Sequence, residues 1–403
     1  MTPRLTIVLP LKGRPLFTLR FLWHANRARV PFRFLIADGE VRPPLSEILE
    51  NADEHFPELD IEYVRYPDDT SFSRYFAKMH DAVRRVRTSY VMLADNDDFL
   101  APAGIERAIE FLESHADYVC CGGGIAGFSV KAPPVAPLGM LLGSLGRLSY
   151  RYAPDSTPDD ICENSALARA LAAFRSQWIF YAVYRTPAQQ IVCKEIAEMD
   201  LSGLHLMERF CAMRTLTLGK ARVDQTVISY FKQADTSLGG HWSASEADTS
   251  GSFVYHLLRS RFTSDFAAIA DRISHVVVEA EGGNVEEAAR HVRLVAEPWL
   301  EYLIRSHYGG LKSLRALRNQ VLRLRSRLKY RSSVILDYRR IRQRLRRNGA
   351  AEEYLEAFQS ELAWVEETLK GGQIQEFLRQ LSGVMDSHMN PLEPSASGSA
   401  VMQ

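Results

Sequence analysis

The chain has 403 residues, of which 46% are hydrophobic and 24% charged, and its 49 Lys and Arg balance its 49 Asp and Glu. This length predicts more than one domain, and the composition excludes a wholly disordered or collagen-like chain. The balanced charge argues against a uniformly basic nucleic-acid-binding protein. Five cysteines without metal-site spacing indicate a reducing compartment, and no apolar run suits a signal peptide or a membrane span, so we expect a cytoplasmic protein.

Short β-branched runs alternate with helical stretches over the first 130 residues. We expect strands over 5–9, 32–37, 60–66, 90–94 and 117–121, and helices over 15–29, 45–56, 72–87 and 103–115. The alternation predicts an α/β fold with a mostly parallel, Rossmann-like sheet covered on both faces. Ligands of such sheets bind beyond the carboxyl ends of the strands, where segment 12–14, Asp38 and segment 95–98 fall.

The rest of the chain divides into a loop-rich middle and a helical C-terminal part. We expect a long loop over 131–160, helices over 162–175 and 195–217, and a late strand within 219–230. The polar, Gly/Ser-rich segment 232–252 is the expected domain boundary. We therefore assign residues 1–245 to an α/β domain, 253–385 to an α-helical domain, and 386–403 to a disordered tail.

Two amphipathic segments near the C-terminus predict an antiparallel helical hairpin with its turn at Asn348-Gly349. Residues 312–347 carry 14 Lys and Arg and one acid, whereas residues 352–367 carry six Glu and no base. These charges can pair within the chain or across a homodimer, or the basic helix can contact an anionic membrane or lipid-linked acceptor. Nucleic acid is the least favoured partner. A peripheral contact at the inner face of the membrane therefore stays open.

The strongest chemical signal is the segment Asp95-Asn96-Asp97-Asp98, directly after an apolar strand. Three crowded carboxylates repel one another and require a cation or strong hydrogen-bond donors. Mg²⁺ and Mn²⁺ prefer oxygen ligands and commonly bind one or two carboxylates together with substrate phosphates. The alternative is a solvated turn in which Asp98 is the N-cap of the next helix.

These segments resemble inverting glycosyltransferases of family 2, which have the GT-A fold. The resemblance lies in LTIVLPLKGRP at 5–15, FLIADG at 34–39 and YVMLADNDDFLAP at 90–102, and extends over about residues 4–130 and 195–235. It implies that Pro10, Lys12 and Arg14 belong to the nucleotide-sugar site and that Asp38 contacts the base. It also implies that Asp95 and Asp97 bind the diphosphate through Mn²⁺ or Mg²⁺.

The family's catalytic base lies about six residues before an Arg, with Gly a few residues further. Met207-Glu208, followed by Arg214 and Gly219, has this spacing, so the resemblance implies that Glu208 is the base. Met stands here for the usual Glu, and Glu for the usual Asp, so Asp200 and Glu198 are the fallback candidates. The resemblance also implies that a His near the end of the domain, here His241, completes the metal site, although a lone His in a polar loop commonly has no such role.

The implied activity is transfer of a sugar from a nucleoside diphosphate sugar to an acceptor hydroxyl, on a glycan, a lipid-linked glycan, a surface polysaccharide or a protein. Trp178, Phe180 and Tyr181 either form an acceptor wall or pack in the core. Two alternatives remain: a non-catalytic nucleotide-sugar-binding or scaffold protein that recruits a partner through its hairpin, and a nucleotidyltransferase. The second ranks last because segment 12–14 contains one Gly.

Overall fold

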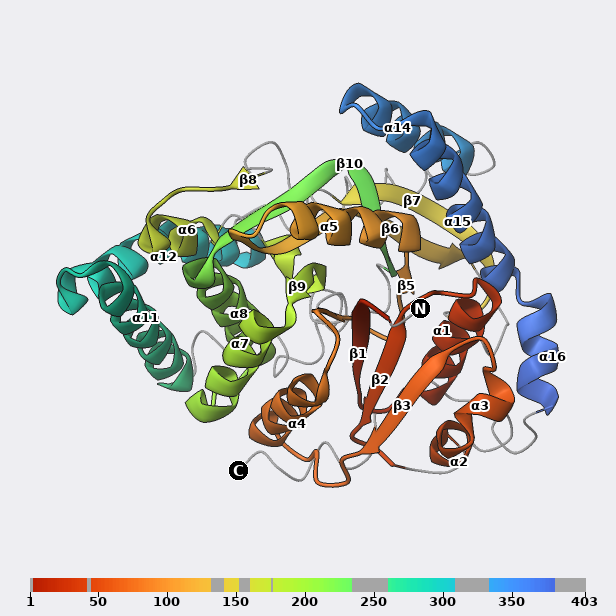
Figure 1. The fold of residues 1–403 in the computed structure, drawn as a ribbon, viewed down its shortest axis with the longest axis horizontal. Helices are drawn as coiled ribbons and strands as arrows, with labels where there is room; N and C mark the ends of the chain where they lie inside the picture. The colour runs from red at the N-terminus through yellow and green to blue at the C-terminus, as the bar shows by residue number, and fades with distance from the viewer. Residues whose placement is uncertain are drawn as a thin grey trace.

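A computed structural model of the chain describes residues 3–41, 45–131, 141–151, 160–174, 177–233, 260–308 and 333–380. Figure 1 shows a curled central sheet with helices packed around it. The strands are β1 (Leu5–Leu11), β2 (Arg33–Asp38), β3 (Asp60–Arg65), β4 (Tyr90–Leu93), β5 (Phe99–Leu100), β6 (Tyr118–Lys131), β7 (Ser144–Arg151), β8 (Asp160–Ile161), β9 (Val183–Arg185) and β10 (Lys220–Gln233).

The helices follow the same chain order. They are α1 (Pro15–Arg27), α2 (Leu45–Glu50), α3 (Ala52–His55), α4 (Phe72–Arg85), α5 (Pro102–Ser114), α6 (Ala166–Ala172), the 3₁₀ helix η1 (Gln177–Tyr181), α7 (Thr186–Met199), α8 (Leu204–Leu218), α11 (Ser260–Glu281), α12 (Val285–Tyr308), α14 (Ser333–Arg347), α15 (Glu352–Lys370) and α16 (Gly372–Gln380). The expected α/β fold with a helical C-terminal region is confirmed.

The first four strands form the parallel part of the sheet, in the order β3-β2-β1-β4. Side chains alternate across it: Leu5, Ile7 and Leu9 pack with α1, α2 and α5, whereas Val8 packs with α4 on the other face. The sequence predicts that Pro10 ends β1, but the strand continues to Leu11. Pro10 is tolerated because β4 pairs with β1 only as far as Val8, so no hydrogen bond to β4 is needed from its missing N–H.

The second part of the sheet is mixed. β6 and β10 are parallel to each other, while β5, β7, β8 and β9 pair with their neighbours in antiparallel fashion. The expected strand over 117–121 is therefore far too short, since β6 continues to Lys131. The expected long loop over 131–160 is wrong over 144–151, where β7 pairs with β6. Gly123 and Gly124 lie in β6 where a Cβ atom would meet β10 or Tyr150 at under 3 Å, so the missing side chains permit close strand packing.

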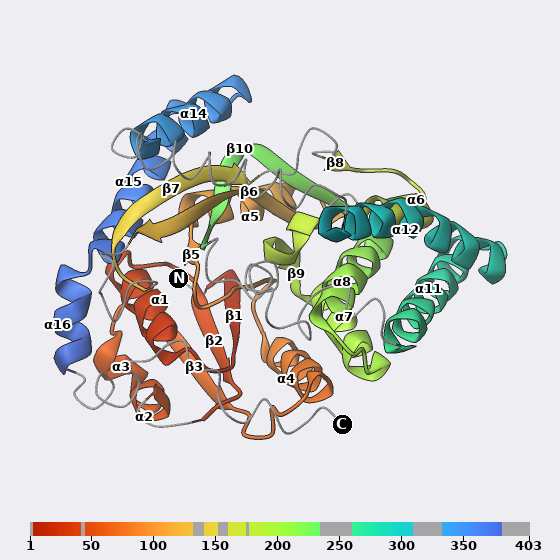
Figure 2. The same cartoon turned by 180° about the vertical axis from the view of Figure 1, so that it is seen from behind.

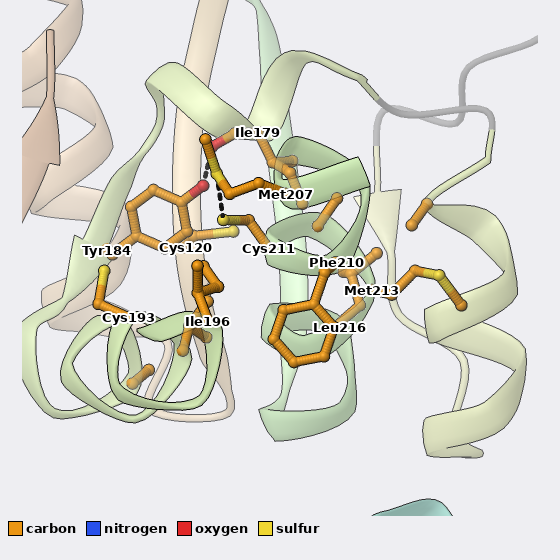
Figure 3. Close-up of a cluster of buried hydrophobic side chains, with 14 of the residues drawn as sticks. Cys120, Ile179, Tyr184, Cys193, Ile196, Met207, Phe210, Cys211, Met213 and Leu216 are labelled. Atoms are coloured by element: carbon orange, nitrogen blue, oxygen red, sulfur yellow. Dashed lines mark hydrogen bonds between the residues drawn. The ribbon is translucent and has the colours of Figure 1, made fainter. Parts of the chain in front are cut away.

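One hydrophobic cluster fixes α7 and α8 against the sheet (Figure 3). Met207, Phe210 and Cys211 of α8 point into it beside Tyr184 of β9 and Cys193 of α7. The Tyr184 hydroxyl donates to the carbonyl of Ile179 in the middle of η1. The single helix expected over 195–217 is instead two helices, broken at Asp200, which has the left-handed φ of 48°.

The C-terminal helices pack in two places (Figures 1 and 2). α11 and α12 lie beside α6 and α8, whereas α14, α15 and α16 lie along the opposite end of the sheet. Leu355, Phe358, Leu362, Val365 and Leu369 are buried, and several of them pack on Phe99, Phe128 and Phe231 of the sheet. The apolar side of α15 thus packs on the α/β core as well as on α14. The expected domain boundary at 232–252 starts within β10, which continues to Gln233; the rest of that segment and the tail from 386 lie outside the described residues.

The basic and acidic segments of the hairpin meet mainly at its turn. Arg346 lies 2.7 Å and Arg342 3.5 Å from Glu352. Glu367 instead pairs with Arg27 of α1, and Glu361 is buried against α5. Within the described part of the chain, charge pairing across the hairpin is therefore limited; residues 309–332 lie outside it. None of the described helices is both long and apolar enough to cross a bilayer.

Candidate active site

The turn after β1 positions two basic side chains. Gly13 and Arg14 have left-handed φ values of 70° and 60°, and Pro15 then begins α1. This turn directs Arg14 to the acidic loop, where its Nη2 lies 3.1 Å from Oδ2 of Asp97. Lys12 instead donates to the backbone carbonyl of Asp69, 2.6 Å away. The segment expected to contact phosphate is therefore joined to the acidic loop through Arg14.

Asp38 ends β2 and is buried. Its Oδ2 accepts a hydrogen bond of 2.7 Å from the hydroxyl of Tyr63 on β3, and its Oδ1 accepts one of 3.0 Å from the backbone N–H of Glu40. Burial and this bond raise the pKa of Tyr63 far above its ordinary value. Two hydrogen bonds therefore hold the Asp38 carboxyl group in place, at the same edge of the sheet as Arg14.

A buried ion pair that the sequence did not predict supports this edge. The ammonium of Lys78 on α4 lies 2.5 Å from Oδ2 of Asp69 and also donates to the carbonyl of Leu11 at 2.8 Å. Both side chains are almost completely buried, and a Cβ atom on Gly39 would lie closer than 3.0 Å to the Asp69 carboxylate. Breaking such a pair typically costs about 3–5 kcal/mol, so we assign Lys78 to positioning the ends of β1 and β2.

The acidic loop follows β4, and its three carboxylates converge. One oxygen of each of Asp95, Asp97 and Asp98 lies within 4.8 Å of the others. Asp98 is buried, and its Oδ1 accepts the backbone N–H of Gln233 at 2.7 Å. Its buried Oδ2 has no hydrogen-bond partner within the described ranges. Burial and the charge of Asp97 raise the pKa of Asp98 well above its ordinary value.

This geometry decides against the alternative in which Asp98 caps the next helix. The N-cap of α5 is Ala101, which has no capping side chain, and the first free N–H group is instead satisfied by Glu361 of α15. Three convergent carboxylate oxygens, one of them buried without a hydrogen bond, form a donor set suited to Mg²⁺ or Mn²⁺. The residues present therefore fit a hard divalent cation.

Helix α1 holds the backbone of the acidic loop. The buried guanidinium of Arg20 donates to the carbonyls of Asp97 and Leu141. The Asn96 amide donates to the Thr18 hydroxyl at 2.9 Å. Asn96, between Asp95 and Asp97, therefore binds the acidic loop to α1. Arg20 binds the backbone of the same loop, and the sequence motifs do not include it.

Two tyrosines and a lysine surround Asp95. The hydroxyl of Tyr181, at the end of η1, donates to the Asp95 carboxylate at 2.5 Å. The backbone N–H of Asp95 donates to the Tyr230 hydroxyl at 2.9 Å. The Tyr181 and Tyr230 rings stack with centroids 4.6 Å apart. Lys232 of β10 donates to the Tyr181 hydroxyl. Tyr181 thus belongs to the acidic site, whereas the side chain of Trp178 lies outside the described part.

Glu208 lies on α8 beside this group. Met207 and Cys211 point into the core, and Glu208 is exposed on the other side of the helix. The surrounding protein nevertheless desolvates its carboxyl group; this desolvation and the charge of Asp95, opposed by Lys232 and Arg209, raise the pKa of Glu208 to about 7. Met207, where the family has Glu, is explained by its place in the core.

The other candidates lie elsewhere. Asp200 pairs with Arg261 at 3.2 Å, and Glu198 pairs with Arg272 at 3.2 Å, so both side chains join α7 to α11. Arg214 makes a bidentate ion pair with Glu195 at 2.9–3.1 Å and has a structural role. Pro10 pairs in register with Ala37 inside the sheet. His241 lies outside the described residues.

A comparison with protein families agrees with this arrangement of residues. Residues 6–179 match the model of glycosyl transferase family 2. This segment is a family 2 glycosyltransferase region. The resemblance carried by the strand-end motifs is thereby confirmed, and so is the glycosyltransferase class. No curated protein matches the chain.

Distant likenesses occur among solved structures. Residues 1–349 of S. aureus TarS share 12% identity over 94% of this chain and 91% of that chain, with a TM-score of 0.43. Their complex with UDP-GlcNAc gives 12% identity, 94% and 92% coverage and a TM-score of 0.42. The mannosyltransferase PcManGT from Pyrobaculum calidifontis, in complex with GDP-Man and Mn²⁺, gives 14% identity, 91% and 88% coverage and a TM-score of 0.37.

Proposed function

We propose that this glycosyltransferase is metal-dependent and inverting, with a nucleoside diphosphate sugar as donor and a hydroxyl group as acceptor. The observation that carries the proposal is the convergence of three carboxylates at the end of β4, with Glu208 exposed beside them. Asp38 and Arg14 come from the neighbouring strand ends of the same family 2 region.

The acidic loop is the proposed site for Mn²⁺ or Mg²⁺. Asp95 and Asp97 would hold the ion, and Oδ2 of Asp98, which is buried and accepts no hydrogen bond within the described ranges, would be a third ligand or would support the loop. A bound divalent ion neutralises the negative charge that develops on a departing diphosphate. Arg14 is placed to add its own charge there, because it already lies beside Asp97. Asp38 is the proposed contact of the nucleotide base.

Glu208 is the proposed general base. As the acceptor oxygen forms its bond to the anomeric carbon, Glu208 takes the hydroxyl proton, and the bond from that carbon to the diphosphate breaks with its electron pair leaving on the phosphate oxygen. Attack from the face opposite the leaving group inverts the configuration. A pKa of about 7 suits this role, because a base near the operating pH is both available and basic.

The acceptor, the homodimer and the scaffold alternative stay predictions from the sequence. A glycan, glycolipid or surface polysaccharide remains the proposed acceptor class. If the protein were a non-catalytic scaffold, it would bind the donor without transferring or hydrolysing it. The environment of Glu208 favours the enzyme, because its carboxyl group lies near Asp95 and Lys232 and has a pKa raised to about 7, which suits a proton acceptor.

We also propose that α14 contacts an anionic membrane. Its outward side presents Ile335 and Leu336, which are 59% and 44% exposed, followed by exposed Arg339, Arg340 and Arg347. An apolar end beside a basic face fits the acyl boundary and headgroups of an anionic lipid surface. Such a contact would place the enzyme near a lipid-linked acceptor.

The activity is tested by screening UDP-, GDP-, CMP- and dTDP-sugars with Mn²⁺ by thermal shift, and then measuring donor hydrolysis and transfer. Asp97→Asn should abolish metal-dependent turnover. Asp117→Asn is the matched control, because Asp117 is an exposed acid paired with Lys220 far from the loop. Unchanged turnover in Asp97→Asn would contradict the metal role, and binding without turnover in the wild type would favour the scaffold.

A further inference from the structure

Lys232 stands out among the residues that the family motifs do not include. It lies at the end of β10, and its side chain is only 17% exposed. Its ammonium lies 3.6 Å from Oδ2 of Asp95 and 3.8 Å from Oδ2 of Asp98, and it donates to the Tyr181 hydroxyl. It therefore bridges two of the three carboxylates of the acidic loop.

The position of this ammonium is that of a counter-ion. Oδ2 of Asp98 is buried and has no hydrogen-bond partner within the described ranges, and the Lys232 ammonium is the cation that faces it at ion-pair distance. The ammonium thus lies at ion-pair distance from two carboxylates at once, with the Tyr181 hydroxyl as its hydrogen-bond acceptor. The carboxylates are thus compensated by a positive charge that the chain itself supplies.

The same two carboxylates belong to the acidic loop that is proposed to hold a divalent ion. A divalent ion held by Asp95 and Asp98 would need the two carboxylates that the ammonium faces at 3.6 and 3.8 Å. Two cations that share the same carboxylates repel each other, most strongly where water is scarce. The ion and the ammonium would therefore compete for the same negative charge.

We propose that the Lys232 ammonium is the resident counter-ion of the acidic loop and that it competes with a divalent ion for the carboxylates of Asp95 and Asp98. This inference rests on the metal site of the proposed function. It adds that metal affinity is set by a competition inside the protein. In the free enzyme the loop stays folded because Lys232 compensates its charge, and metal binding exchanges one cation for another.

The test uses Mn²⁺ alone, titrated by isothermal calorimetry into the full-length metal-free protein without any sugar nucleotide. Lys232→Met should bind Mn²⁺ about tenfold more tightly than the wild type or better, because the competing charge is gone. Lys232→Arg should stay within a few-fold of the wild type, because it keeps the charge. Lys220→Met, at the opposite end of the same strand, where the half-buried lysine pairs with Asp117, is the matched control and should change nothing.

Circular dichroism and thermal unfolding check that each variant is folded, and Lys232→Gln, which keeps a polar group beside Tyr181, replaces Lys232→Met if that variant does not fold. Equal or weaker Mn²⁺ binding in Lys232→Met or Lys232→Gln would overturn the competition while leaving the metal site intact. Equally tight binding in Lys232→Arg and Lys232→Met would overturn it too, since the charge would not matter. If no protein binds Mn²⁺, both this inference and the metal part of the proposed function fail.

Discussion

Glu361 of α15 accepts a hydrogen bond of 2.8 Å from the backbone N–H of Ala103, at the first turn of the helix that follows the acidic loop. The carboxyl group is buried, and burial raises its pKa to about 7, while the bond from Ala103 opposes the rise. A residue more than 250 positions away in the chain thus caps α5. This contact joins the C-terminal helices to the segment that carries the site.

We expect Glu361→Gln to change the pH dependence of stability. Glu361 keeps its proton to higher pH in the folded protein than in the unfolded chain, so its contribution to the free energy of unfolding falls as pH rises from about 4.5 to about 7. Gln keeps an acceptor for Ala103 and cannot ionise. The variant should therefore gain stability relative to the wild type at pH 8 compared with pH 5, by about 1–3 kcal/mol. Denaturant unfolding at the two pH values measures the difference; a constant difference would contradict the prediction.

Glu208→Gln should lower kcat by about 10²–10⁴-fold, because the proton acceptor is lost. Donor binding should change little, since the side chain keeps its size. In the wild type, kcat/KM should rise as pH increases through about 7, where Glu208 loses its proton, and this rise should be absent in the variant. Steady-state kinetics over pH 5–9 measure both effects. Glu198→Gln, which removes a carboxylate that pairs with Arg272, is the control; a similar loss there would move the base away from Glu208.

Gly39→Ala should destabilise the strand ends beneath the site. The new methyl group would lie closer than 3.0 Å to the Asp69 carboxylate, which is held by Lys78 and cannot move freely. Overpacking of this kind costs about 1–3 kcal/mol, which thermal unfolding resolves. Gly203→Ala serves for comparison, because nothing lies within 4 Å of the position that its new methyl group would take. Equal melting temperatures for the two variants would show that the Asp69–Lys78 pair is not rigid.

The double variant Arg339→Glu/Arg340→Glu should bind anionic vesicles at least about tenfold more weakly than the wild type, because each basic residue near the surface contributes about 1 kcal/mol. Sedimentation with phosphatidylcholine vesicles containing about 30% phosphatidylglycerol measures the binding. Arg290→Glu/Arg293→Glu carries the same charge change on exposed positions of α12 and should bind normally. Equal losses in the two double variants would indicate a general charge effect, and no binding by the wild type would exclude the membrane contact.

The site residues that could be predicted are those that lie next to a recognisable strand in the sequence. Asp38 and the acidic loop each follow an apolar strand directly, and the edge rule for parallel strands brings them together. Lys232, Tyr181 and Arg20 could not be placed in this way, because their positions depend on strand pairing and helix packing between distant segments. The sequence contains one indication of the role of Lys232, which is an ionisable residue at the end of the apolar run ISYFK.

The same distinction explains the errors in the fold. Helix and strand periodicity locates most elements of the first 115 residues, where apolar strands and amphipathic helices alternate regularly. β7 and the full length of β6 escape it because their Gly and Ser residues lack strand propensity, and their pairing with each other and with β10 overrides it. The leucine pattern of α15 indicates a hairpin seam, yet the helix packs largely on the sheet.

The position of α15 limits how this protein can be divided or recombined. Its buried side chains cover Phe99 and Phe231, its Thr368 hydroxyl lies 2.8 Å from Nδ1 of His24, and its Glu361 caps α5. A chain ending before residue 333 would leave aromatic residues of the sheet open to water and aggregation. The α/β core and its last helices therefore form one structural unit, and replacing these helices with those of a related protein would require the facing side of the core to be replaced with them.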